Sequence, residues 1–160
     1  FCVSSSLTRG APVVHRRGPL WEAVRASMAI PGVYSPMLHA GELLVGQALV
    51  LPTKSTRLRY VVVAPTMRLP TDVSGSVNAY LAMRAILRAV EAHNRANKPT
   101  PAEQIRSLAV PGLCTGTGKM PAERAAYQMW TAYRSVIMGD LEWTKSLEKQ
   151  LEHDRKMRQR

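Results

Sequence analysis

The chain has 160 residues, 46% hydrophobic and 21% charged, which suffices for one globular core and argues against a wholly disordered chain. Its 22 Lys and Arg against 11 Asp and Glu give a net charge of +11, which favours anionic partners such as nucleotides or nucleic acid. No apolar run reaches the ~20 residues that cross a bilayer, so we expect no membrane partner. Two cysteines and four dispersed histidines predict neither a metal site nor a disulfide framework. We expect no cofactor and an intracellular, reducing compartment.

Short elements are predicted in the first forty residues. Residues 1–7 predict a strand that enters a turn at 8–10, and residues 13–15 predict the return strand of a hairpin. Apolar residues at i, i+4 spacing predict a helix over residues 20–28, which the Pro-Gly pair at 31–32 ends.

Further along, residues 42–51 and 59–64 predict two strands joined by a polar turn. Residues 61–64 are continuously apolar, which predicts a strand buried on both faces. A long helix is predicted over residues 78–94. Its apolar stripe consists of Tyr80, Met83, Leu87 and Val90.

The last third predicts another buried strand at residues 105–110, a Gly-rich loop, and a helix from Pro121 to about residue 138. A charged helix is predicted from residue 141 to the end. Its docking stripe would be Trp143, Leu147 and Leu151. From residue 42 the order is strand, strand, helix, strand, loop, helix, helix. This order predicts an α/β fold, a mixed sheet flanked by helices in three layers, with parallel pairing around the crossover helix.

The Gly-rich loop carries the strongest chemical signal. Residues 111–121 read PGLCTGTGKMP and lead from a predicted strand to the start of a helix. Such a turn presents free backbone N–H groups and the positive end of a helix dipole, which suit a diphosphate. The spacing fits neither a Walker A loop nor the dinucleotide G-x-G-x-x-G. From spacing alone, a phosphate-binding loop and a plain strand–helix turn both remain open.

Four blocks of sequence carry a family resemblance. They read GELLVGQA at 41–48, YVVVAPTMR at 60–68, NAYLAMRA at 78–85, and the loop with its flanks at 107–129. In this order they resemble the C-terminal two-thirds of a macrodomain, the ADP-ribose-binding α/β module, most closely its bacterial and phage-associated branch. The resemblance implies a macrodomain-like core over residues 41–138.

The resemblance also implies a ligand site, in which the Gly-rich loop surrounds the distal ribose and the diphosphate. The contacts it implies are Gly112, Thr115, Gly116, Thr117, Gly118 and Lys119, with Pro65 and Thr66 beside the same cleft. A macrodomain begins with strands and a helix that supply an Asp for adenine and an Asn-rich loop for ribose. Residues 1–40 contain no Asp and no Asn, so we expect the first β-β-α unit to be replaced and binding to be weakened.

Residues 1–45 resemble another family, the patatin-like lipid acyl hydrolases. The matching stretches read VSSSLTRG at 3–10 and GPLWEAVRASMAIPGVYSP at 18–36, followed by residues 39–45. The family's G-x-S-x-G nucleophile is absent, and Gly-Gln-Ala at 46–48 stands where its catalytic Asp is expected. We therefore name no catalytic residue and lean against an enzyme. The chain looks like a chimera, and an engineered splice, a gene fusion and a degenerate descendant all remain open.

Three segments are expected: 1–40 packed on or completing the sheet, the core at 41–138, and a charged C-terminal helix at 139–160. The first hypothesis is a weakened binding module for ADP-ribose or a related nucleotide diphosphate. The alternative is a non-catalytic structural or interaction protein, in a homo-oligomer or a basic ribonucleoprotein assembly that binds nucleic acid. Cys114 lies near a predicted helix start, where a thiol pKa is expected to fall, yet without a His or Asp partner it is interpreted as a small loop residue.

Overall fold

A computed structural model describes residues 2–6, 11–15, 37–38, 41–53, 55, 58–96 and 103–159. The predicted N-terminal hairpin is confirmed, because β1 (Cys2–Ser6) pairs antiparallel with β2 (Ala11–His15). A second short antiparallel pair joins β3 (Met37–Leu38) to β4 (Gly41–Glu42). The helix predicted over residues 20–28 lies outside the described residues.

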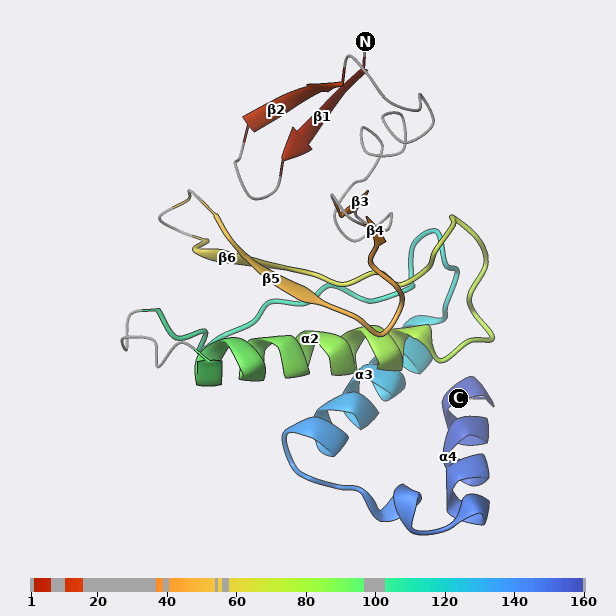
Figure 1. Cartoon of the computed structure of the whole chain (residues 1–160). Coiled ribbons are helices and arrows are strands. Elements are labelled where there is room, and N and C mark those ends of the chain that lie inside the picture. The colour runs from red at the N-terminus through yellow and green to blue at the C-terminus, as the bar shows by residue number, and fades with distance from the viewer. Residues whose placement is uncertain are drawn as a thin grey trace.

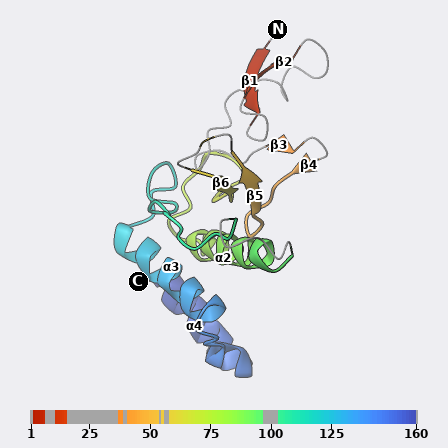
Figure 2. The same cartoon turned by 90° about the vertical axis from the view of Figure 1, so that its left-hand side faces the viewer.

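The body of the molecule is built from strands on one side and helices on the other (Figure 1). Strand β5 (Leu49–Pro52) pairs antiparallel with β6 (Tyr60–Val63), and this pair lies over α2 (Asn78–Ala96). Helix α3 (Ala122–Val136) crosses α2 on the side away from the strands, and Figure 2 shows the same succession of layers. The predicted α/β fold is thereby confirmed.

Strand β5 is shorter than the strand predicted over residues 42–51, because a turn interrupts it. The amide of Gln47 donates to the Leu44 carbonyl at 3.0 Å, and the Gln47 side chain accepts from the Leu44 amide at 3.0 Å. Gly46 adopts a φ of +91°, which an L side chain rarely tolerates. The apolar run at 61–64 is buried only at Val63, so burial on both faces does not extend along the strand.

Helix α2 begins at the predicted residue and buries a face rich in alanine. Its fully buried residues include Ala79, Ala82 and Ile86, whereas three residues of the predicted stripe are only half-buried. This face packs in one core with Leu113 and Cys114 and with Ala125 of α3. The helix start is fixed by Asn78, whose amide donates to Ser76 Oγ at 3.2 Å and whose side chain donates to the Thr66 carbonyl at 2.9 Å.

Residues 105–110 differ from the buried strand that the sequence predicts. They belong to no strand, and residues 106–109 are exposed. The side chain of Asn94 bonds both the amide and the carbonyl of Ile105 at 3.0 Å, which fixes the start of this segment as a neighbouring strand would. The described strand pairs are all antiparallel, and the described residues form no ladder with 106–110. A strand needs a partner backbone, and the apolar pattern alone does not supply one.

The C-terminal region has two helical pieces where one helix was predicted. The 3₁₀ helix η1 (Glu142–Lys145) is followed by Ser146 in extended conformation, and then by α4 (Leu147–Gln159). The predicted docking stripe is wrong at Leu147 and Leu151, which are 69% and 63% exposed, whereas Trp143 is half-buried. Met157, 4% exposed, docks α4 on α2 and α3 instead.

His153 lies in an aromatic stack that holds α4 against the body. Its ring stacks on Trp143 at a centroid distance of 4.7 Å and meets Tyr80 of α2 edge-on at 5.9 Å. The buried Nε2 of His153, Nε1 of Trp143 and hydroxyl of Tyr80 have no hydrogen-bond partner among the described residues. Burial lowers the pKa of His153 from its usual 6.5, although Asp154 and Asp140 favour the charged form and Lys156 opposes it.

This environment predicts acid-sensitive docking of α4. As pH falls below 6.5, the unfolded chain takes up a proton that the folded His153 resists, so stability is present above that pH and is lost below it. Urea unfolding of wild type at pH 7.5 and pH 5.5 is expected to show this loss, and His153→Phe is expected to reduce it. An equal pH dependence in both proteins would contradict the assignment to His153.

Candidate Gly-rich loop

The loop between residues 111 and 121 is held in place by buried side chains. Leu113, Cys114 and Met120 are 6%, 5% and 2% exposed, and Gly118 is also buried. Leu113, Cys114 and Met120 belong to a hydrophobic core that connects the loop with α2, α3 and residues 67–73, and Gly118 lies beside it. The other members of that core are Met67, Val73, Ala79, Ala82, Ile86 and Ala125. The loop is therefore anchored at four points, which fixes its backbone.

The residues between these anchors form an exposed crest. Thr115, Gly116 and Thr117 are exposed, and so are Gly112 and Lys119 at the two sides. Within the loop the amide of Lys119 donates to the Gly116 carbonyl at 2.9 Å, and that of Met120 donates to the Cys114 carbonyl at 3.0 Å. Thr115 closes a turn that begins at Gly112, whereas the amides of the exposed Gly116 and Thr117 donate to no acceptor among the described residues. Two backbone donors thus remain available on the crest.

The backbone of the loop is strained at two places. Cys114 and Lys119 have φ values of 65° and 53°, in the left-handed region that residues other than glycine seldom adopt. Such conformations tend to be found at ligand clamps and turns, where the surrounding structure enforces them. The loop glycines themselves lie outside this region. Their presence therefore needs a steric explanation.

Two loop glycines differ in what surrounds them. A Cβ added at Gly118 would lie 2.7 Å from the Cys114 carbonyl oxygen and 2.7 Å from Val73 Cγ2, so packing requires a glycine there. A Cβ added at Gly116 would meet nothing within 4 Å. Neither φ nor packing explains Gly116, and the space above it is open to a ligand.

Pro65 and Thr66, which follow strand β6, are both buried. The side chain of Thr66 is hydrogen-bonded to the Cys114 thiol, and its carbonyl accepts from Asn78. The structure thus brings Thr66 together with the loop. Their buried position makes them a support for the loop backbone.

The charges beside the loop have both signs. Lys119 is exposed and close enough to Asp72 to contribute to the lowered pKa of that carboxyl. The larger cause of the lowered Asp72 pKa is hydrogen bonding from Ser74, whose amide donates to Asp72 Oδ1 at 2.9 Å. Asp72 therefore remains a carboxylate at neutral pH and offsets part of the Lys119 charge.

The thiol of Cys114 behaves differently from the sequence-based expectation. Burial raises its pKa to about 11, although the hydrogen bond with Thr66 acts in the opposite direction. The predicted lowering of the Cys114 pKa is wrong because the side chain is buried in the core and is not exposed beside the start of the helix. Its interpretation as a small loop residue without a reactive partner fits this position.

Cys114 is consequently expected to resist alkylation. With a pKa of about 11, roughly one thiol in a thousand is ionised at pH 8, and the side chain is buried as well. Iodoacetamide treatment of Cys2→Ser protein, followed by mass spectrometry, should leave Cys114 unmodified until denaturant is added. Rapid labelling of the folded protein would show an accessible thiolate and contradict this.

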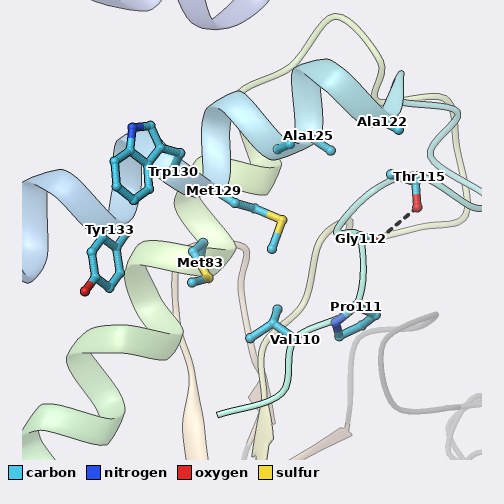
Figure 3. Close-up of a pocket in the computed structure, with 11 residues that line it drawn as sticks. Met83, Val110, Pro111, Gly112, Thr115, Ala122, Ala125, Met129, Trp130 and Tyr133 are labelled. Carbon is cyan, nitrogen blue, oxygen red and sulfur yellow. Dashed lines mark hydrogen bonds between the residues drawn. The ribbon is translucent and has the colours of Figure 1, made fainter. Parts of the chain in front are cut away.

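An open groove adjoins the loop and was not predicted from the sequence (Figure 3). Its cavity volume is about 600 Å³, and it is bounded by α2, α3 and residues 110–115. Met83, Val110 and Met129 line its middle, and Trp130 and Tyr133 form one end. Because three segments distant in sequence make this groove, no local motif could have revealed it.

The described residues hold no cluster of three or more potential metal ligands. Among the same residues, no helix has the length and apolarity that a membrane crossing requires.

A comparison with known families places this geometry in a wider context. The model of the Macro domain family matches residues 32–129, which is more than half of the chain. The chain belongs to the Macro domain family. The match includes β5, β6, α2 and the Gly-rich loop, so the loop described above is part of the Macro domain itself. The matched range begins before residue 41 and ends before residue 138, the two boundaries that the sequence predicts.

Curated relatives of the Macro domain chain match only a part of it. Proteins named as uncharacterized NTE family proteins, from Mycobacterium bovis and Mycobacterium tuberculosis, are 42% identical to it over 50 residues. That stretch is 31% of this chain and 9% of each relative, so the chain spans a small fraction of their length. This partial match is consistent with a patatin-like segment. No solved structure matches the chain.

Proposed function

We propose that this Macro domain chain is a binding module for ADP-ribose or a related nucleoside diphosphate, and that residues 112–119 hold its phosphates. The observation that carries the proposal is the exposed crest at residues 115–117, next to backbone amides that have no acceptor among the described residues. Phosphate oxygens accept hydrogen bonds from such amides and are favoured near the start of a helix.

The surroundings of the loop support an anionic ligand. Helix α3 begins at Ala122, directly after the loop, and Pro121 gives its first amides no side-chain cap. Lys119 and the net charge of +11 add to the attraction, whereas Asp72 and Glu123 oppose it. The absence of Asp and Asn from residues 1–40 suggests weakened binding. We place this function in a core at residues 41–138, with residues 1–40 and 139–160 as additions to it.

Calorimetric titration with ADP-ribose tests the proposal through Gly116. A methyl group at Gly116 disturbs no protein atom within 4 Å but occupies the space above the crest. Gly116→Ala is therefore expected to leave the melting temperature unchanged and to weaken ADP-ribose binding roughly tenfold, the loss of about one hydrogen bond.

The matched control is Gly75→Ala. Gly75 is also exposed, and an added Cβ there also meets nothing within 4 Å, but it lies outside the loop. This variant is expected to bind ADP-ribose as wild type does. Wild-type protein that gives no binding at millimolar ADP-ribose, or equal binding by both variants, would refute the proposed site.

A second candidate is a non-catalytic interaction protein in a homo-oligomer or a basic assembly with nucleic acid. Leu147 and Leu151, one helical turn apart on α4, are 69% and 63% exposed, which suits a partner surface. Sedimentation of wild type and the Leu147→Ser/Leu151→Ser double variant, with and without RNA, tests this candidate. A protein that sediments as a monomer at every salt concentration, with or without RNA, would exclude this candidate.

A further inference from the structure

The apolar groove beside the loop offers a second contact for the same ligand. Gly112 and Thr115 line both the groove and the loop, so a ligand can pass from one to the other without leaving the surface (Figure 3). The Thr115 hydroxyl donates to the Gly112 carbonyl at 2.9 Å, which turns its hydrogen-bonding group towards the backbone. Ala122 and Ala125 follow along α3 and leave room between the loop and the far end.

The far end of the groove is aromatic. The rings of Trp130 and Tyr133 are stacked, with centroids 5.5 Å apart and planes 13° from parallel. Even so, Trp130 is 52% exposed and Tyr133 37% exposed. A large indole surface in water is unfavourable, and a flat group that covers it would regain that free energy.

Along α3 the groove extends from Ala122, which follows the loop, to the aromatic end at Trp130. Trp130 lies eight residues after Ala122 on α3, a distance of about 12 Å along the helix axis. An extended nucleoside diphosphate places its base and its phosphates at comparable separation. Its volume also suits a groove of about 600 Å³, which lies within the usual range for small-molecule sites.

From these observations we infer that Trp130 and Tyr133 stack with the base of the nucleotide whose phosphates the loop binds. This inference rests on the proposed function. The groove is lined mostly by Met, Ala, Val and aromatic side chains, so it offers few groups that could distinguish one base edge from another. Stacking tolerates every base because each has a π-face, and larger rings gain more. The site should therefore prefer purine over pyrimidine nucleotides and discriminate weakly between adenine and guanine.

Calorimetric titrations with ADP-ribose, GDP, UDP and pyrophosphate test the base contact. Trp130→Ala is expected to weaken ADP-ribose and GDP binding roughly tenfold and to leave pyrophosphate binding unchanged. Trp130→Phe keeps a stacking ring and is expected to retain most of the affinity. The control Ile137→Ala removes a side chain that is 51% exposed and lies outside the groove, and it should bind as wild type does.

The outcomes separate this inference from the proposed function. If ADP-ribose and pyrophosphate bind but Trp130→Ala changes neither, the base site is wrong and the phosphate loop stands. If pyrophosphate and ADP-ribose both fail to bind wild type, the proposed function fails and the base site with it. If Trp130→Ala instead abolishes a wild-type dimer in sedimentation without changing nucleotide affinity, the groove is a self-association surface and the inference is overturned.

Discussion

Gln128→Ala is expected to lower the free energy of unfolding by about 3 kcal/mol. Gln128 of α3 is 0% exposed and bonds three separate parts of the chain. Its Oε1 accepts from the Tyr80 amide at 3.1 Å, and its Nε2 donates to the carbonyls of Ser76 at 2.8 Å and Met157 at 2.9 Å. Alanine would leave these groups without partners in the interior and would also open a cavity.

Urea unfolding followed by circular dichroism measures this loss. The matched control is Gln150→Ala on α4, where the side chain is exposed and, among the described residues, bonds only the Thr144 carbonyl at 3.3 Å. Its expected effect is below about 0.5 kcal/mol. Similar losses in the two variants would show that the buried hydrogen bonds of Gln128 contribute little.

Gln128→Glu provides a further test of the same hydrogen bonds. The carboxylate could still accept from Tyr80, but its second oxygen would face the Ser76 and Met157 carbonyls, which have no proton to offer. Burial and these oxygens raise the pKa of such a Glu, so the variant is expected to lose stability as pH rises. Its deficit relative to wild type should therefore be larger at pH 8 than at pH 5.

Local patterns predicted the elements whose stability is largely local. The hairpin β1–β2 and the start of α2 at Asn78 follow from turn residues and helical periodicity within a few residues of sequence. The position of the Gly-rich loop before α3 was likewise predictable, because Pro121 marks the end of the turn just before the helix. The sequence predicts Pro121 as the first helical residue, but α3 begins one residue later, at Ala122.

Features that depend on distant partners were not predictable in this way. Residues 105–110 are apolar enough for a strand, but strand formation depends on a neighbouring backbone that the pattern does not specify. On α4, Leu147 and Leu151 have the spacing of a docking face, and yet Met157 is the residue buried against α2 and α3. Gln128 was overlooked because a polar residue counts against burial, although it stands three positions after buried Ala125 and four before buried Ala132. That spacing is the signal that could have found it.

Gly118→Ala is expected to cost about 3 kcal/mol of unfolding free energy, at the upper end for an overpacked site. The added Cβ would lie 2.7 Å from the carbonyl oxygen of Cys114, 2.7 Å from Val73 Cγ2 and 3.1 Å from Met67 Cε. The Met67 and Val73 side chains can move, but the Cys114 carbonyl cannot, because it accepts the hydrogen bond from Met120 that closes the loop. The Gly118 carbonyl also accepts from the Val73 amide at 3.0 Å, so a shift of this backbone would disturb a second segment.

The comparison of Gly118→Ala with Gly116→Ala separates packing from ligand binding within one loop. Both add a single methyl group two positions apart, and the open surroundings of Gly116 predict a change in stability below about 0.5 kcal/mol. Val73→Ala removes one of the two shortest contacts, so the double variant Gly118→Ala/Val73→Ala should lose less than the sum of its single variants. If the stability losses of the two single variants add fully in the double variant, the strain arises from the contact with the Cys114 carbonyl alone. A Gly118→Ala protein as stable as Gly116→Ala would mean that the loop can shift away from its anchors, and a backbone that shifts so easily could not hold its amides ready for phosphate.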